Sequence, residues 1–162
     1  MASGLQSIDN INHEYFMDIA IEEAIIAGER GDKPIAAVLV HNNNIIGKSS
    51  NTWNTRNSKV HHAENWLCME YSNYLRKYGK ECIIYSTLEP CIMCISTIIM
   101  ADIRNIVVGY EDIYMKTWDN IQKLEWIFSR INNYKIGIRK EKCIDLIKRY
   151  GEEDDKKILL PE

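Results

Sequence analysis

Residues 82–94, CIIYSTLEPCIMC, contain a strand, a break and the start of a helix in one short stretch. The run CIIYST (82–87) is apolar and β-branched, as in a buried strand. Pro90 cannot extend a strand interior but suits the first turn of a helix. Cys91 and Cys94 are three residues apart, so they share one face of that first turn. The stretch therefore predicts a strand that leads two thiols to the edge of a sheet.

The flanking sequence extends this unit into an α/β pattern. The runs IAAVLV and IIG, separated by the turn HNNN, predict a hairpin. Helices and strands alternate afterwards, which indicates a three-layer α/β/α sandwich around a mixed five-stranded sheet. The predicted helices cover residues 15–27, 62–78, 91–100, a segment with Ile121, Leu124, Phe128 and Ile131 on one face, and 143–150; further strands are expected at 105–110 and 134–139.

Length and composition favour an ordinary globular protein. The 162 residues suit one domain over 1–162, with residues 1–12 and 151–162 expected to be loosely ordered. The net charge of −3 opposes nucleic-acid binding that depends on global positive charge. No apolar run has the length of a membrane span, and MASGLQSIDN lacks the features of a signal peptide. These observations predict a cytoplasmic protein without a membrane partner.

The five cysteines do not suggest a disulfide framework, because their number is odd and no secretion signal is evident. Cys68, Cys82 and Cys143 fall on apolar faces and are expected in the core. The Cys91–Cys94 pair leaves two alternatives, a redox site or a metal site.

The stretch HHAEN (61–65) favours the metal site. His62 opens a predicted helix, as Cys91 does, and helix N-termini favour the thiolates that bind metals. If the two helix starts meet, His62, Cys91 and Cys94 supply three ligands and leave a fourth position open, the pattern of a catalytic zinc site. Glu64 is placed to move a proton beside that position. A thioredoxin-like redox site would leave His62 and Glu64 unexplained.

The segments PIAAVLV, IIGKSSN, HAE, TLEPCIMC and IVVG resemble the zinc-dependent cytidine deaminase superfamily. The similarity is greatest to the branch of TadA-type tRNA adenosine deaminases, guanine deaminases and fungal-type cytosine deaminases, and it places about two-thirds of the chain in register. It implies one Zn²⁺ held by His62, Cys91 and Cys94, with Glu64 as the catalytic proton shuttle. It also implies a homodimer with helices beside the zinc site in its interface.

The same resemblance implies a set of substrate-binding residues. Asn51 would hydrogen-bond the base, and the backbone of Ala63 and Glu89 would line the reacting centre. Trp53 is a further candidate because it could stack on a base. His61 stands where relatives carry a small residue and could add a polar group to the pocket.

The loop YEDIYMKTWDN (110–120) departs from the Gly/Ala-rich loop of the tRNA enzymes. Its bulky and acidic residues, including Tyr114, Trp118 and Asp119, suit a closed small-molecule pocket, and acids repel phosphates. We therefore expect hydrolytic deamination of a purine or pyrimidine base or nucleoside, of guanine or cytosine type, with release of ammonia.

Other interpretations remain open at this point. The protein is alternatively a tRNA-specific adenosine deaminase, because basic residues cluster at 76–80 and 139–142. It is alternatively a deaminase-fold protein that binds zinc or nucleotide without catalysis. A closed, structural zinc site would need a fourth ligand, for which His61 is the local candidate.

Overall fold

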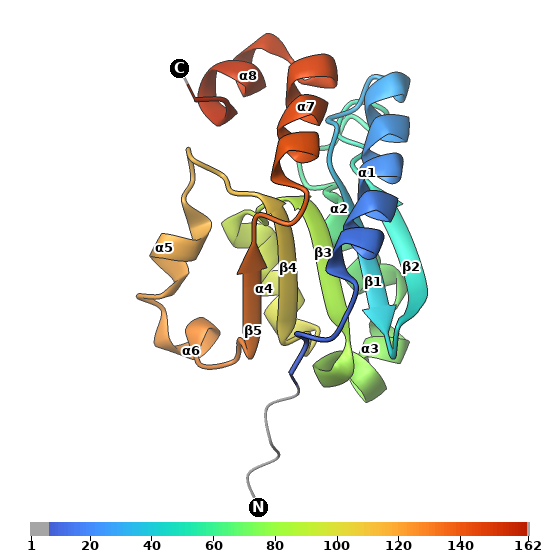
Figure 1. The fold of residues 1–162 in the computed structure, drawn as a ribbon, viewed down its shortest axis with the longest axis vertical. Helices are drawn as coiled ribbons and strands as arrows, with labels where there is room; N and C mark the ends of the chain where they lie inside the picture. Colours follow the sequence, from blue (N-terminus) through green and yellow to red (C-terminus); the bar gives the residue numbers. More distant parts are fainter. Residues whose placement is uncertain (1–6, 162) are drawn as a thin grey trace, which may run out of the picture.

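The computed structural model describes residues 7–161, and its central element is one mixed sheet of five strands (Figure 1). The strand order is β2-β1-β3-β4-β5. Strand β1 pairs antiparallel with β2 and β3, whereas β3, β4 and β5 run parallel. The strands are β1 (Ala36–His41), β2 (Asn44–Ser50), β3 (Ile83–Leu88), β4 (Asn105–Tyr110) and β5 (Asn133–Ile136). The predicted mixed five-stranded sheet and its hairpin are confirmed.

Helices cover both faces of the sheet (Figure 1). One face packs on α1 (His13–Arg30), α7 (Lys140–Tyr150) and α8 (Glu153–Leu159). The other packs on α2 (Ala63–Glu70), α3 (Ser72–Tyr78), α4 (Ile92–Met100) and α5 (Thr117–Ile121). The predicted α/β/α sandwich is therefore confirmed.

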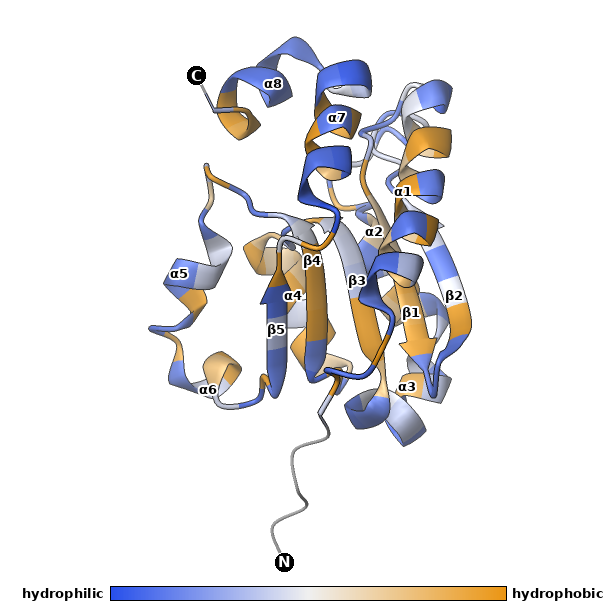
Figure 2. Cartoon of the chain, in the orientation of Figure 1, coloured by the Kyte–Doolittle hydropathy of each residue, from blue (hydrophilic) through white to orange (hydrophobic). Residues whose placement is uncertain are grey.

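The three central strands are buried along their whole length, which explains their continuous apolar sequences (Figure 2). Successive side chains point to opposite faces of the sheet. Val38 and Val40 accordingly join the core beneath α1 and α7, whereas Ala37 and Leu39 join the core beneath α2 and α4.

Two predicted helices are divided in the structure. The helix expected over 62–78 is interrupted at Tyr71, which separates α2 from α3, and the 3-10 helix η1 (Gly79–Glu81) follows. The helix expected through Ile131 is replaced by α5 and the short α6 (Glu125–Phe128). Among the residues that the structure describes, no helix combines the length and apolarity needed to cross a membrane.

The chain ends differ from the expectation of loose order. Residues Glu153–Leu159 form α8, which is held by an ion pair between Lys33 and Asp155 and by a hydrogen bond from the Tyr110 hydroxyl to the Leu159 carbonyl. At the other end, residues 1–6 lie outside the described part of the chain. Ile8 is buried, and its carbonyl lies 2.8 Å from Nε2 of His13. Packing against the sheet body holds Ile8 and Glu153–Leu159 in place, a contribution that local composition does not reveal.

Candidate active site

The starts of α2 and α4 meet beside the sheet and bring together one imidazole and two thiols. His62 is the N-cap of α2, Cys91 is the N-cap of α4, and Cys94 lies in the first turn of α4. Nδ1 of His62 lies 3.3 Å from Sγ of Cys94 and 3.6 Å from Sγ of Cys91. The predicted meeting of the two helix starts is therefore confirmed.

This cluster fits a zinc ion. Zn–N and Zn–S bonds of about 2.0 and 2.3 Å in a tetrahedron would separate the nitrogen and sulfur ligands by about 3.5 Å. Hydrogen bonds from Cys94 and His62 lower the pKa of the Cys91 thiol to about 4, against the opposing effect of burial, so this ligand is ready as a thiolate. Among the described residues, the only such group of potential ligands is His62, Cys91 and Cys94.

Glu64 lies in the first turn of α2, two residues beyond His62. Its side chain is buried, and the Ser86 hydroxyl of β3 donates a hydrogen bond of 2.8 Å to its Oε1. Burial raises the pKa of the Glu64 carboxyl above its ordinary value. A carboxyl group in this environment suits both acceptance and return of a proton.

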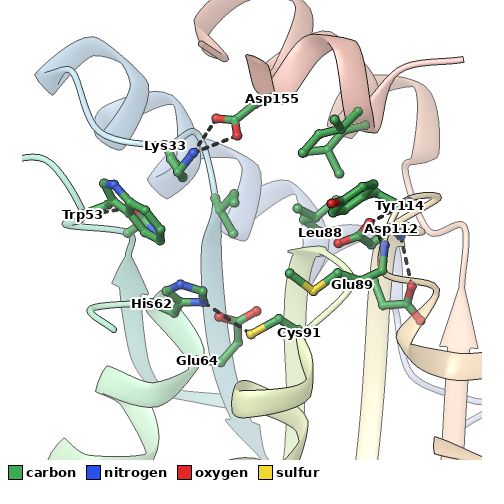
Figure 3. A pocket seen from close by; sticks show the side chains of 15 residues that line it. Lys33, Trp53, His62, Glu64, Leu88, Glu89, Cys91, Asp112, Tyr114 and Asp155 are labelled. Carbon is green, nitrogen blue, oxygen red and sulfur yellow. Dashed lines mark hydrogen bonds and ion pairs between the residues drawn. The ribbon is translucent and has the colours of Figure 1, made fainter. Parts of the chain in front are cut away.

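A cavity of about 180 Å³ opens above these groups (Figure 3). Its volume is below the roughly 300–1,000 Å³ of sites for drug-sized ligands, so it suits a small heterocycle. Figure 3 shows His62, Glu64 and Cys91 on one side of the cavity and the Lys33–Asp155 ion pair across from them. The remaining wall is largely Ile35, Asn51, Trp53, Leu88, Glu89, Asp112, Tyr114, Met115, Ile158 and Leu159.

Comparison with known proteins agrees with this geometry. A model of the cytidine and deoxycytidylate deaminase zinc-binding region matches residues 10–110. The chain belongs to this family. The deaminase superfamily resemblance and the zinc requirement expected from the sequence are thereby confirmed.

Three relatives illustrate the similarity. The chain is 34% identical to the tRNA-specific adenosine deaminase of Buchnera aphidicola subsp. Baizongia pistaciae (strain Bp) over 146 residues, which cover 85% of this chain and 86% of the relative. A structure from studies of A-to-I editing by tRNA deaminases at the wobble position is 29% identical, with a TM-score of 0.68, over 82% of this chain and 98% of that one. The Bacillus subtilis guanine deaminase structure is 31% identical, with a TM-score of 0.57, over 63% and 66%.

These relatives bear on the expected substrate. The curated relative is named for tRNA, so the expectation that tRNA is the disfavoured substrate is not supported. Guanine deaminase is also among the similar structures. The comparisons therefore show the family of this chain, and its relatives include both substrate classes.

Three of the expected substrate residues, Asn51, Trp53 and Glu89, line the cavity. Asn51 is buried, and its Oδ1 accepts a 2.8 Å hydrogen bond from the N–H of Trp53. The Trp53 ring lies 5.8 Å from the ring of His62, centroid to centroid. The loop after β2 therefore places an amide and an aromatic ring beside the metal ligands.

Of the two residues whose backbone was expected at the reacting centre, Ala63 and Glu89, only Glu89 lines the cavity. Ala63 is the first residue of α2 and is buried between His62 and Glu64, but it is not part of the cavity wall. Glu89 does line the cavity, while its backbone N–H donates to the Tyr110 carbonyl over 2.8 Å. The Glu89 N–H therefore already has a hydrogen-bond acceptor within the protein.

His61 and Asp119 do not line the cavity. The His61 ring stacks on Trp66, with centroids 5.8 Å apart, in a separate surface hollow. Its Nδ1 is buried without a hydrogen-bond partner. Asp119 lines another hollow, beside α5. Because His61 is absent from the ligand cluster, the alternative of a closed zinc site with His61 as fourth ligand has no support.

Sequence reasoning missed three polar residues of the site. Lys33 and Asp155 form the ion pair opposite the metal ligands, with Nζ–Oδ distances of 2.6 and 2.7 Å, and Ser86 contacts Glu64. Lys33 stands in a helix-ending loop and Asp155 in an acidic segment, where charges are usually solvated. The one signal in the sequence that could have identified Ser86 is the alternation of side chains in β3. It places Ser86 on the same face of the sheet as Ile84, which packs beneath α2 and α4.

Proposed function

We propose that the protein is a zinc-dependent hydrolytic deaminase that acts on an exocyclic amine of a purine or pyrimidine. One observation carries this proposal: the buried carboxyl group of Glu64 lines the same small cavity as His62 and Cys91, two members of the ligand cluster that Cys94 completes. Three ligands leave a zinc position open for chemistry, and a buried acid beside it can exchange protons with the reactants.

The roles of the chain's own residues follow from this arrangement. Zinc in the cluster would supply a Lewis acid that activates water at neutral pH. Glu64 takes one proton from the attacking water and passes it to the ring nitrogen. It then takes the second proton, from the hydroxyl group now on the ring carbon, and gives it to the amine, so that a carbonyl forms, the C–N bond breaks and ammonia leaves. Ser86 orients Glu64 through its hydrogen bond. Asn51 and Trp53 hold the ring against the ligands.

The small volume of the cavity, about 180 Å³, favours a free base or nucleoside, for which guanine or cytosine is the expected type. Ile158 and Leu159 of α8 close the side opposite the metal ligands, and the Lys33–Asp155 ion pair fastens that helix. A nucleotide within a folded RNA would need α8 to move before its base could enter.

A second candidate, deamination of adenosine in tRNA to inosine, is favoured by the names of the curated relative and of the editing deaminases. Basic groups also flank the cavity: the Lys33 ammonium lies 4.9 Å and the Lys59 ammonium 6.0 Å from the Trp53 ring centroid. An aromatic ring between lysines suits a base attached to phosphates.

The deciding assay is ammonia release by the zinc-loaded protein. The panel holds guanine, cytosine, adenine, their nucleosides and an anticodon stem–loop. We expect turnover that Glu64→Gln lowers by about 100-fold or more, because proton transfer is lost, with zinc content unchanged. Glu70→Gln, in the exposed last turn of α2, is the matched control.

Each outcome of this assay has a definite meaning. Activity on RNA alone would replace the small-molecule proposal with the tRNA one. Normal turnover by Glu64→Gln would contradict the mechanism. Zinc binding without turnover on any substrate would support a non-catalytic zinc-binding protein of the same fold.

We also propose a homodimer formed through the hollow beside α2. This hollow, the α2 face, is lined by Val60, His61, Asn65, Trp66, Met69 and Thr97. It exposes large apolar side chains, Met69 being 66% exposed, yet it also buries two polar atoms without partners, Nδ1 of His61 and Oδ1 of Asn65. A second copy packed on the α2 face would cover these apolar side chains and could supply hydrogen-bond partners for the two polar atoms.

A further inference from the structure

The carboxylate of Glu89 joins the metal-ligand turn to the loop that follows β4. Glu89 is 4% exposed and lies two residues before Cys91. Its Oε2 accepts the N–H of Asp112 at 3.0 Å (Figure 3). Its Oε1 accepts the N–H of Trp118 at 2.9 Å and the hydroxyl of Tyr134 at 3.1 Å. Both oxygens of one buried carboxylate are thus used to hold three donors from other segments.

The donors bound by Glu89 control one wall of the cavity. Asp112 in turn accepts the N–H groups of Tyr114 and Met115 on its Oδ1, at 2.9 and 2.8 Å. Asp112, Tyr114 and Met115 all line the cavity. At the far end of the loop, the Trp118 ring stacks on Tyr134, with centroids 4.0 Å apart. A chain of hydrogen bonds therefore runs from Glu89 to the backbone of Tyr114 and Met115, two residues of the cavity wall.

The other end of this connection is rigid. The N–H of Glu89 donates to the Tyr110 carbonyl at the end of β4, and Pro90 and Cys91 follow directly. Movement of the carboxylate relative to the metal ligands is consequently restricted to its own side-chain torsions. Hydrogen bonds to an ionised acceptor are stronger than neutral ones, so this one group can order several loop residues.

We propose that Glu89 is a positioning residue that fixes residues 112–118 as the cavity wall and thereby determines which ring substituents fit opposite the metal ligands. The proposal rests on the proposed deaminase function for its substrate consequence. It differs from the expected role of the Glu89 backbone, since the side chain acts here and acts through other residues.

Glu89→Gln is the direct test, because it keeps the size of the side chain. Its amide nitrogen must face either Asp112 or the donors Trp118 and Tyr134, so at least one side of the connection is lost. We expect the amides of Asp112 and Trp118 to exchange with solvent about tenfold faster. We also expect KM to rise selectively, changing the preference between two panel substrates about fivefold, with zinc content unchanged.

Glu111→Gln is the matched control, because Glu111 is in the same loop but is exposed and pairs with Lys140. Exchange rates in Glu89→Gln equal to those of this control would overturn the proposal. Faster exchange with unchanged substrate preference would overturn its specificity part. If Glu89→Gln does not fold, Tyr134→Phe removes one donor only; faster exchange of Trp118 supports the proposal, and unchanged exchange contradicts it. A wild-type protein silent on every substrate would refute the deaminase function separately, while the exchange rates still decide whether Glu89 holds the loop.

Discussion

At the scale of single residues, Asp32 shows how one carboxylate can fix a substrate loop. It is 3% exposed and accepts hydrogen bonds from Nε of Arg30, from the N–H groups of Asn54 and Thr55, and from the Thr55 hydroxyl. Burial alone would raise the pKa of Asp32, but these bonds outweigh burial and lower it below 3.8. Asp32 therefore anchors the loop that carries Trp53.

We expect Asp32→Asn to lower the free energy of unfolding by roughly 1.5–3 kcal/mol, because a charged acceptor of several bonds is lost. Since the folded pKa lies below the unfolded value of 3.8, this stabilisation is fully present above pH 3.8 and is lost as the pH falls from 3.8 through the lower folded pKa. Urea unfolding of both proteins at pH 7 and pH 3 measures the difference. Asp145→Asn, an exposed acid on α7, is the control, and an equal loss in both variants would contradict this role.

At the scale of elements, the helix α8 is expected to control access to the cavity. Asp155→Asn should loosen α8 and raise KM for a free base about two- to fivefold, since a partly exposed ion pair contributes up to about 1 kcal/mol. Steady-state kinetics of this variant, of Lys33→Met and of the double variant test the idea. The double variant should behave like each single variant, because the pair acts as a unit.

Glu153→Gln is the control for α8, as Glu153 is 81% exposed and pairs only within its own helix among the described contacts. The direction of the change also separates the two substrate classes. If RNA is the substrate, loosening α8 should leave or improve kcat/KM on the stem–loop. Unchanged kinetics in both Lys33→Met and Asp155→Asn would rule out a role for α8 in access.

The sequence predicted those elements whose pattern is set by burial. Continuous apolar runs identified β1, β3 and β4, and Pro90 marked the start of α4, because a buried strand and a helix start impose strong local constraints. The division of the helix at Tyr71 and the existence of α8 were not predicted. Both depend on packing against the sheet. For α8, the polar composition of residues 151–157 gives no sign of this packing.

The same distinction applies to the site. The ligand cluster and Glu64 were predicted because their chemistry requires fixed spacings at helix starts. His61 and Asp119 were assigned to the pocket only by their position in the sequence. In the structure they line two other surface hollows. The Glu89 carboxylate was missed because its three donors lie 23, 29 and 45 residues further along the chain.

At the scale of the whole molecule, the α2 face provides the test of assembly. A charge placed at Met69 would be buried against a second copy without a partner, which strongly disfavours association. We therefore expect the wild-type protein to sediment at twice the 18.9 kDa chain mass and Met69→Glu at the mass of one chain. Sedimentation equilibrium makes this measurement.

The control for assembly is Ile26→Glu, a change at a 50% exposed apolar residue of α1 on the opposite face of the sheet. This variant should keep the dimer mass, because α1 lies outside the proposed interface. A monomeric wild-type protein, or a dimer that Ile26→Glu disrupts and Met69→Glu does not, would exclude the α2 face. Zinc content should be equal in all three proteins, since Met69 is not among the metal ligands; a joint loss of zinc and dimer would instead show that the charge disturbed α2 and the His62 ligand it positions.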